Sequence, residues 1–185
     1  MHKTLRMIFD NATDKETIFN KAEDFIAKMN LRIVARDAQR PWGGFLVIDE
    51  KDADQFIASF FPAFNAGQLA FPGGEDGKTG RLSPKILIVA PGKRLSWQYH
   101  HRRAEIWTLI GGEAAVVTSD TDEERNTISL EKGKHLELKQ GERHRLIGLE
   151  NWGIIAEIWR HTDANHPSDE EDIVRVQDDF GREKL

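Results

Sequence analysis

The chain contains no cysteine, which excludes disulfide bonds, thiolate metal sites and cysteine nucleophiles. It also lacks a hydrophobic run long enough to cross a bilayer, and its first residues lack the apolar core of a signal peptide. Positive charge is not in excess, because 26 lysines and arginines against 31 aspartates and glutamates give a formal net charge of −5. This balance disfavours general nucleic-acid binding. We therefore expect a cytoplasmic protein of one domain that binds neither nucleic acid nor membrane.

The N-terminal part of the chain predicts helices and a loop. Residues 13–30 have apolar side chains at helical intervals, and Thr13 and Glu16 are spaced as a capping box. A second, short helix is predicted over residues 52–61. Residues 65–80 are rich in glycine and other turn-forming residues, so we expect a long mobile loop there.

From residue 85 the pattern changes to short apolar or alternating segments. Turn signals separate them, among them the glycine pair at 111–112 and Gly153. Many short strands at close spacing predict an antiparallel barrel or sandwich. We therefore divide the domain into an N-terminal arm, residues 1–84, which packs on a barrel, residues 85–185. The predicted strands of both parts span residues 31–35, 45–48, 85–90, 95–100, 105–110, 114–118, 127–130, 135–138, 145–149, 154–159 and 173–176.

Four potential metal ligands are spaced so that a small barrel could bring them together. Gln98 and His100 lie two residues apart on one predicted strand, so their side chains point to the same face. Glu105 begins the next predicted strand, and His144 begins a later one. An amide oxygen, two imidazoles and a carboxylate would suit one divalent metal ion with positions left open for water or substrate. Zinc is the first choice for these ligand types, and nickel, manganese, cobalt and iron are alternatives.

The spacing of these four residues resembles that of the cupin superfamily. The first cupin motif is a glycine, five residues, His-x-His, three or four residues, a glutamate, six residues and a glycine. In this sequence it reads Gly92, Gln98-Tyr99-His100, Glu105 and Gly112. His144 lies at the interval of the second motif, which departs from the family at Lys139 and Gly148. The resemblance implies a mainly β fold, a jelly-roll barrel (double-stranded β-helix), here with one or two N-terminal helices.

Residues 91–107 are most similar to the isomerase domain of bifunctional mannose-6-phosphate isomerase/mannose-1-phosphate guanylyltransferases. Those proteins use a Gln-x-His…Glu…His metal set, so the glutamine in the first histidine's place fits the resemblance. Residues 40–43 and, further along the chain, residues 171–175 and 180–182 match the same domain. The resemblance therefore implies a metal-dependent isomerase of a sugar phosphate.

Such an isomerase moves a proton between C1 and C2 through an enediolate and needs a general base. Glu157 is the first candidate, because strand alternation places it on one face with Ile155 and Trp159, either in the barrel lumen or in solvent. His101 is the second candidate. Lys85, Arg103, Arg175 and Arg182 are candidates for holding a phosphate, and Trp107 for contacting the sugar, with surface charge and core packing as the alternatives.

A larger set of cations lies within the region of resemblance and could form a rim that attracts a dianionic substrate. Its members are Arg94, Arg102, Arg103, Lys139, Arg143 and Arg145.

Three functions agree with these features. The resemblance favours interconversion of mannose 6-phosphate and fructose 6-phosphate. The alternatives are an isomerase of an unphosphorylated sugar such as lyxose or mannose, and a sugar-binding cupin without turnover. Because cupin barrels commonly pair through edge strands, a homodimer is the expected assembly.

Overall fold

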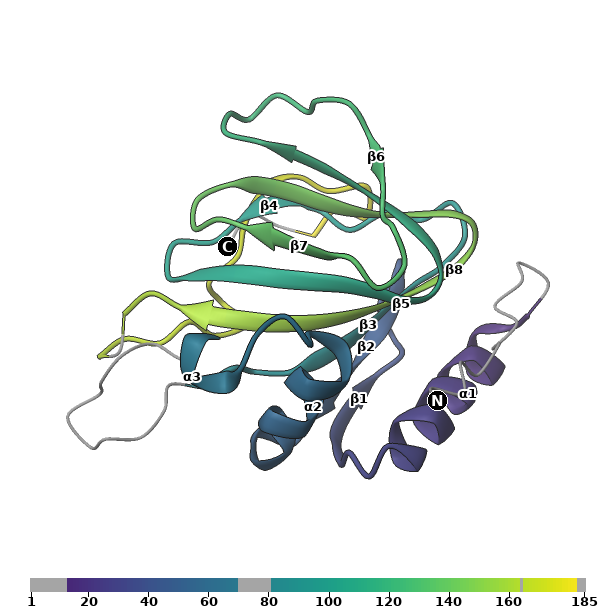
Figure 1. Cartoon of the computed structure of the whole chain (residues 1–185). Coiled ribbons are helices and arrows are strands. Elements are labelled where there is room, and N and C mark those ends of the chain that lie inside the picture. Colours follow the sequence, from purple (N-terminus) through teal and green to yellow (C-terminus); the bar gives the residue numbers. More distant parts are fainter. Residues whose placement is uncertain (1–12, 70–80, 164, 183–185) are drawn as a thin grey trace.

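The computed structural model describes residues 13–69, 81–163 and 165–182. Its strands form one antiparallel sheet that curls into a barrel, and its helices pack outside this barrel (Figure 1). The predicted mainly β barrel with N-terminal helices is confirmed. No helix in this part of the chain is long and apolar enough to span a membrane. The elements are α1 (Lys15–Lys28), β1 (Ile33–Asp37), β2 (Gly43–Ile48), η1 (Glu50–Asp52), α2 (Ala53–Phe60), α3 (Ala66–Leu69), β3 (Lys85–Val89), β4 (Trp97–Tyr99), β5 (Arg103–Ser119), β6 (Ile128–Ser129), β7 (His135–Leu138), β8 (Arg143–His161) and β9 (Val174–Gln177).

The residue that caps the N-terminus of helix α1 lies one position later than predicted. The carboxylate of Asp14 accepts hydrogen bonds from the backbone N–H of Thr17, at 2.9 Å, and from its hydroxyl. The predicted capping box is therefore wrong: Asp14 takes the role given to Thr13, and Glu16 forms an ion pair with Arg36 on β1. A carboxylate at this position caps the helix as well as threonine would, which sequence spacing alone could not decide.

The N-terminal arm is continuous with the barrel. Strands β1 and β2 extend the same sheet through β3, so the boundary expected after residue 84 falls between neighbouring strands. The apolar faces of α1 and α2 pack on this sheet and form a core with its outer side. The loop expected over residues 65–80 begins instead with the short helix α3, and residues 70–80 lie outside the described part.

Two of the predicted turns are bends within long strands. The glycine pair at 111–112 lies inside β5 and Gly153 lies inside β8, and Gly112 and Gly153 face each other across the two strands. The register shifts on both sides of Gly112, and a Cβ on Gly153 would approach the carbonyl oxygen of Glu113 to 2.6 Å. Glycine thus permits a sharp bend and close approach without ending the strand.

The bends decide which residues meet inside the barrel. The first half of β5 pairs with the second half of β8, which places Trp107 directly opposite Glu157. The first half of β8 pairs with β4, which places His144 directly opposite Gln98. A second apolar core, which includes Leu87, fills the barrel on the same side as these residues.

Candidate active site

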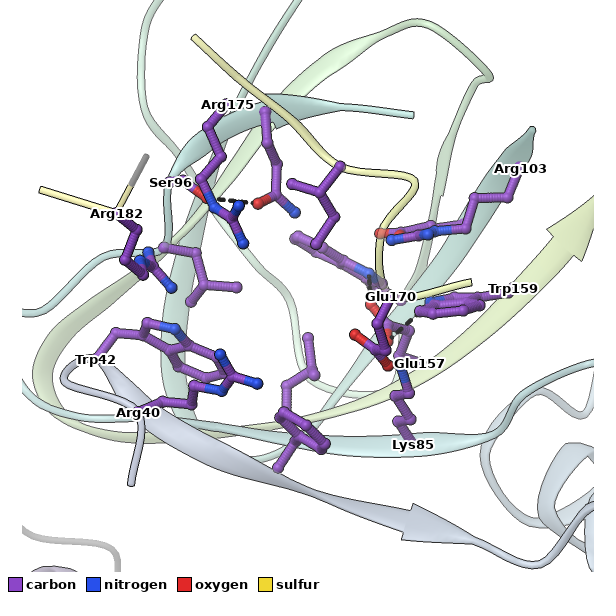
Figure 2. A pocket seen from close by; sticks show the side chains of 17 residues that line it. Arg40, Trp42, Lys85, Ser96, Arg103, Glu157, Trp159, Glu170, Arg175 and Arg182 are labelled. Carbon is purple, nitrogen blue, oxygen red and sulfur yellow. Dashed lines mark hydrogen bonds and ion pairs between the residues drawn. The ribbon is translucent and has the colours of Figure 1, made fainter. Parts of the chain in front are cut away.

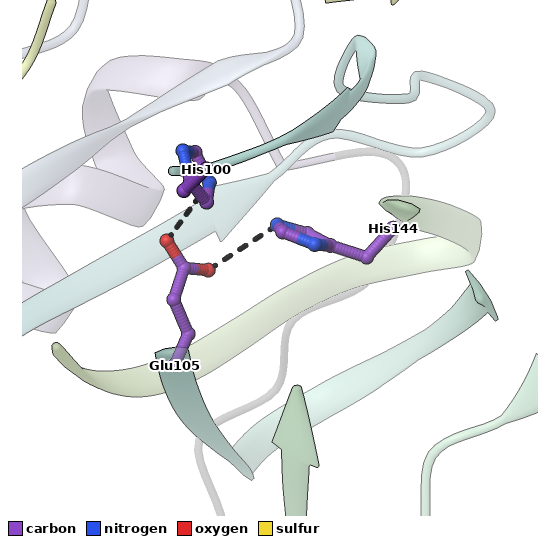
Figure 3. Close-up of side chains that lie close together, drawn as sticks. All are labelled: His100, Glu105 and His144. Atoms are coloured by element: carbon purple, nitrogen blue, oxygen red, sulfur yellow. Dashed lines mark ion pairs between the residues drawn. The ribbon is translucent and has the colours of Figure 1, made fainter. Parts of the chain in front are cut away.

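Three of the predicted metal ligands form a compact buried cluster (Figure 3). His100 follows β4, Glu105 lies on β5 and His144 lies on β8. Glu105 Oε1 is 3.1 Å from His100 Nε2, and Glu105 Oε2 is 3.4 Å from His144 Nε2. Their potential ligand atoms all lie within 4.8 Å of one another. This separation is small enough for one ion to contact all three residues.

Backbone carbonyls orient both imidazoles. Nδ1 of His100 donates to the carbonyl oxygen of Asp172, and Nδ1 of His144 donates to that of Glu142, at 3.0 Å. Because a carbonyl can only accept, each Nδ1 carries the proton and each Nε2 has a lone pair; that of His100 accepts a hydrogen bond from Arg103 at 3.1 Å, and that of His144 faces Glu105. Burial lowers the pKa of His100, which keeps this imidazole neutral. A neutral imidazole with Nδ1 held by an acceptor is the form that binds a metal.

The cluster fits a divalent cation because two of its buried atoms face each other without a proton between them. Glu105 Oε2 and His144 Nε2 have no hydrogen-bond partner within the described residues. Burial opposes ionisation of Glu105, but the charge of Arg103 holds the pKa of its carboxyl well below the usual range. A carboxylate and an imidazole lone pair at 3.4 Å repel each other unless a cation lies between them.

The fourth predicted ligand, Gln98, lies on the adjoining wall. It is buried, its Cα is paired with that of His144, and it lines the cavity described below together with Glu105. Its amide oxygen accepts a hydrogen bond from the hydroxyl of Ser96. The structure therefore brings Gln98 to the site but engages its oxygen with Ser96.

A cavity of about 240 Å³ adjoins the cluster, and Glu157 faces it (Figure 2). The two oxygens of Glu157 accept hydrogen bonds from the indole N–H groups of Trp107, at 3.0 Å, and Trp159, at 3.1 Å. Burial and the nearby charge of Glu105 raise the pKa of Glu157 to about 7, although the charge of Lys85 works in the opposite direction. Of the two orientations left open by the sequence, the structure has the inward one.

The cavity has two cationic ends (Figure 2). One end adjoins the candidate metal cluster and is called the metal end below. There Lys85 and Arg103 lie beside Glu157, and Arg103 donates to Glu105 Oε1 at 2.8 Å. At the other end lie Arg40, Arg175 and Arg182, so all five predicted substrate residues, Lys85, Arg103, Trp107, Arg175 and Arg182, line the cavity. Among the lining residues that sequence reasoning missed are Arg40, Trp42 and Glu170. The first two lie in the segment 40–43 that resembles the isomerase domain, and nothing distinguishes Glu170 within its acidic stretch.

The structure does not bring His101 to the cavity. Its side chain is exposed, and its ring contacts Tyr99 edge-on at 5.2 Å between centroids. A residue next to an inward-facing strand residue points outward, so His101 faces away from His100.

The predicted cationic rim is also mostly absent, because four of its arginines are neutralised by carboxylates away from the cavity. Of the six cations only Arg103 lines the cavity, and Lys139 is exposed. The ion pairs are Arg94–Asp179, Arg102–Asp169, Arg143–Asp122 and Arg145–Glu124.

Arg145 has a structural role, and its replacement should destabilise the protein. Its side chain is 0% exposed, and its guanidinium binds Glu124 and both the side chain and the backbone of Gln177. Hydrogen bonds to charged groups contribute about 1.5–3 kcal/mol each, and the Glu124 left behind is partly exposed, so we expect Arg145→Ala to lower the free energy of unfolding by about 2–3 kcal/mol. Urea denaturation measures it, with the exposed Arg125→Ala as the matched control, which should change the value by less than about 0.5 kcal/mol.

Together, the barrel, the buried His/Glu/His cluster inside it and the adjoining cavity define the chain as a cupin. Residues 76–178, more than half of the chain, match the family described as Mannose-6-phosphate isomerase C-terminal. The chain belongs to this family.

The individual relatives match part of this chain, and the chain matches a smaller part of each relative. The chain is 34% identical over 103 residues to the alginate biosynthesis protein AlgA of Pseudomonas aeruginosa, which is 56% of this chain and 20% of that protein. It is 30% identical over 149 residues to a mannose-1-phosphate guanylyltransferase of Escherichia coli, which is 80% of this chain and 24% of that protein. It therefore spans a quarter or less of the length of these relatives. Among solved structures, a cupin barrel domain protein from Salinispora arenicola is similar at 22% identity, over 44% of this chain and 64% of that one, with a TM-score of 0.37.

Proposed function

We propose that this chain is a metal-dependent aldose–ketose isomerase that interconverts mannose 6-phosphate and fructose 6-phosphate. The observation that carries the proposal is Glu157, a buried carboxylate that faces the cavity beside the His/Glu/His cluster and whose pKa is raised by burial to about 7. A general base that takes a proton from one carbon and returns it to the next works best with a pKa near the ambient pH. The family to which the chain belongs supports the choice of sugar.

The buried cluster supplies the ligands for the metal. His100, Glu105 and His144 would hold a divalent cation, with Gln98 beside them, and zinc is our first choice for such ligands. When bound, the ion supplies positive charge for the oxygens of the enediolate.

Glu157 is oriented for proton transfer by its two tryptophans. Each carboxylate oxygen accepts one indole N–H, so both oxygens are fixed in direction and retain lone pairs for a substrate proton. Lys85 is paired with Glu157 across β3 and β8, which places an ammonium group beside the base. This positive charge favours the negative charge that develops on the sugar oxygens when Glu157 takes the proton.

The other end of the cavity supports the phosphate. Arg40 and Arg182 form ion pairs with Asp37 and Asp178, whereas Nε of Arg175 is buried and has no hydrogen-bond partner within the described residues. A guanidinium can bind two phosphate oxygens at once. Because these arginines lie across the cavity from Lys85 and Glu157, they suit a phosphate on the far end of the sugar from the carbon that gives up its proton to Glu157.

Turnover in deuterated water tests the proposal. We expect mannose 6-phosphate and fructose 6-phosphate to interconvert and to gain deuterium at C2 or C1, and free mannose and lyxose to react much more slowly. Equal turnover of the free sugars, unaffected by salt, would instead indicate an isomerase of unphosphorylated sugars. Sugar binding without any interconversion would indicate a binding protein and would end the isomerase proposal.

Replacing Arg175 should weaken binding of the phosphorylated sugar and leave binding of the free sugar nearly unchanged. Charge-assisted hydrogen bonds contribute about 1.5–3 kcal/mol each, so we expect Arg175→Met to raise the KM for mannose 6-phosphate about tenfold or more. The KM for mannose should change less than about twofold, since mannose has no phosphate for Arg175 to bind. Arg160→Met, at an arginine that pairs with Glu137 and does not line the cavity, is the matched control. Steady-state kinetics at low and high salt provide the measurement, and an equal effect on both sugars would contradict a phosphate site at Arg175.

A further inference from the structure

One carboxylate in the cavity differs from the others in its origin and its contacts. Glu105 and Glu157 lie on strands and are buried, whereas Glu170 lies on the loop between β8 and β9 and its side chain is 59% exposed. Its carboxylate forms an ion pair with Lys85 at the metal end of the cavity (Figure 2). An exposed side chain therefore supplies the counter-charge for a residue inside the cavity.

Lys85 is fixed in place and cannot follow Glu170. Its side chain is 7% exposed, and its Nζ lies 3.6 Å from the ring centroid of Trp159 and 5.5 Å from that of Phe45. Within the described residues, Lys85 has no second ion pair. A buried ammonium group needs a counter-charge. When Glu170 moves away, the carboxylate of Glu157 remains beside Lys85 but accepts hydrogen bonds from two tryptophans, so Lys85 favours a further anion.

The loop backbone is held on both sides of Glu170. The carbonyl of Asp169 accepts a hydrogen bond from Arg103 at 3.0 Å. The carboxylate of Asp172 accepts the backbone N–H groups of residues 101–102 at 3.0 and 2.9 Å. The Glu170 side chain can therefore rotate into solvent without displacing the loop.

We propose that Glu170 is an exchangeable counter-ion for Lys85, displaced when a ligand places an oxyanion at the metal end of the cavity. The oxyanion then binds Lys85, and the Glu170 carboxylate turns into water. A ligand that is neutral at this end displaces Glu170 less readily, because it leaves Lys85 with Glu157 alone beside it, so Glu170 favours ligands that carry negative charge there. In the proposed isomerase the group that qualifies is the enediolate oxygen, so the exchange favours the transition state over the bound sugar.

Calorimetric binding of inorganic phosphate tests the exchange without sugar or turnover. The titrations use metal-loaded protein carrying Arg175→Met, which weakens the cationic end across the cavity from Lys85. Because phosphate no longer has to displace a carboxylate, we expect Glu170→Gln to bind it about three- to tenfold more tightly. Glu171→Gln removes the same charge from a neighbouring exposed residue and should change the affinity less than about twofold.

A second pair of variants separates exchange from general electrostatics. Lys85→Met should weaken phosphate binding, and adding Glu170→Gln to it should restore less than about twofold, because the pair that exchanges is gone. Thermal unfolding confirms that each variant is folded. A gain below twofold for Glu170→Gln, or the same gain with and without Lys85, overturns the proposal. If these couplings hold but no sugar is isomerised, the proposed function fails and the exchange stands.

Discussion

His100→Ala/His144→Ala protein, purified without chelator, should contain almost no divalent metal, whereas the unchanged protein should contain one ion per chain. The two substitutions remove two of the three clustered ligands and leave Glu105 as a buried carboxylate without an ion. Loss of the positive charge that stabilises an enediolate removes several kcal/mol of transition-state stabilisation, so isomerase activity should fall at least about a thousandfold. Elemental analysis and the isomerase assay measure the two effects.

His135→Ala is the matched control, because this histidine is exposed and lies on β7 outside the cluster. Its metal content and activity should remain those of the unchanged protein. Circular dichroism and thermal unfolding verify that the double variant is folded. Undiminished metal in a folded double variant would show that the ion binds elsewhere and would remove the cluster from the mechanism.

The elements around this site could be predicted because the signals for them are local. Alternation over residues 154–159 places Glu157 and Trp159 on one face of a strand, and the structure has both at the cavity. The two-residue spacing of Gln98 and His100 likewise predicts one face for both, and the structure has Gln98 at the cavity and His100, just after β4, in the adjoining cluster. Sequence spacing predicts the face on which each side chain lies, because a strand fixes the direction of each side chain relative to its neighbours.

Connectivity was harder to predict because it depends on contacts between distant segments. A glycine pair is a turn signal in the sequence, but at 111–112 the pairing of β5 with β8 continues across it, so four predicted strands are two. Charge partners pose the same problem. Arg94 binds Asp179 and Arg145 binds Glu124, and no local pattern shows that these arginines are already paired with carboxylates. A cation in a sequence is therefore weak support for a ligand until its carboxylate partners are known.

Glu157→Gln should reduce isomerase activity about a thousandfold while leaving the metal content unchanged. The substitution removes the proton acceptor, for which general-base contributions of about 10²–10⁴ are typical, and touches none of the metal ligands. In the unchanged protein, kcat/KM should fall as the pH drops through the pKa of Glu157, because protonation disables the base; burial raises this pKa to about 7 without an ion, and a bound cation places it lower. Glu150→Gln, at an exposed position of the same strand, should have neither effect. A normal rate in Glu157→Gln would assign the base to another residue.

The same substitution should change how stability depends on pH. Burial raises the pKa of Glu157 from 4.5 to about 7, so the folded state binds more protons than the unfolded state between these values. The free energy of unfolding of the unchanged protein therefore decreases as the pH rises through this interval, by about 2–3 kcal/mol from this group. Glutamine does not titrate, so Glu157→Gln should gain about that much relative to the unchanged protein between pH 5 and pH 8. Urea unfolding of metal-free protein at the two pH values measures it, because a bound cation near Glu157 would lower its pKa. An equal difference between the two proteins at pH 5 and pH 8 would mean that Glu157 is ionised throughout and is no better placed to take a proton than a surface glutamate.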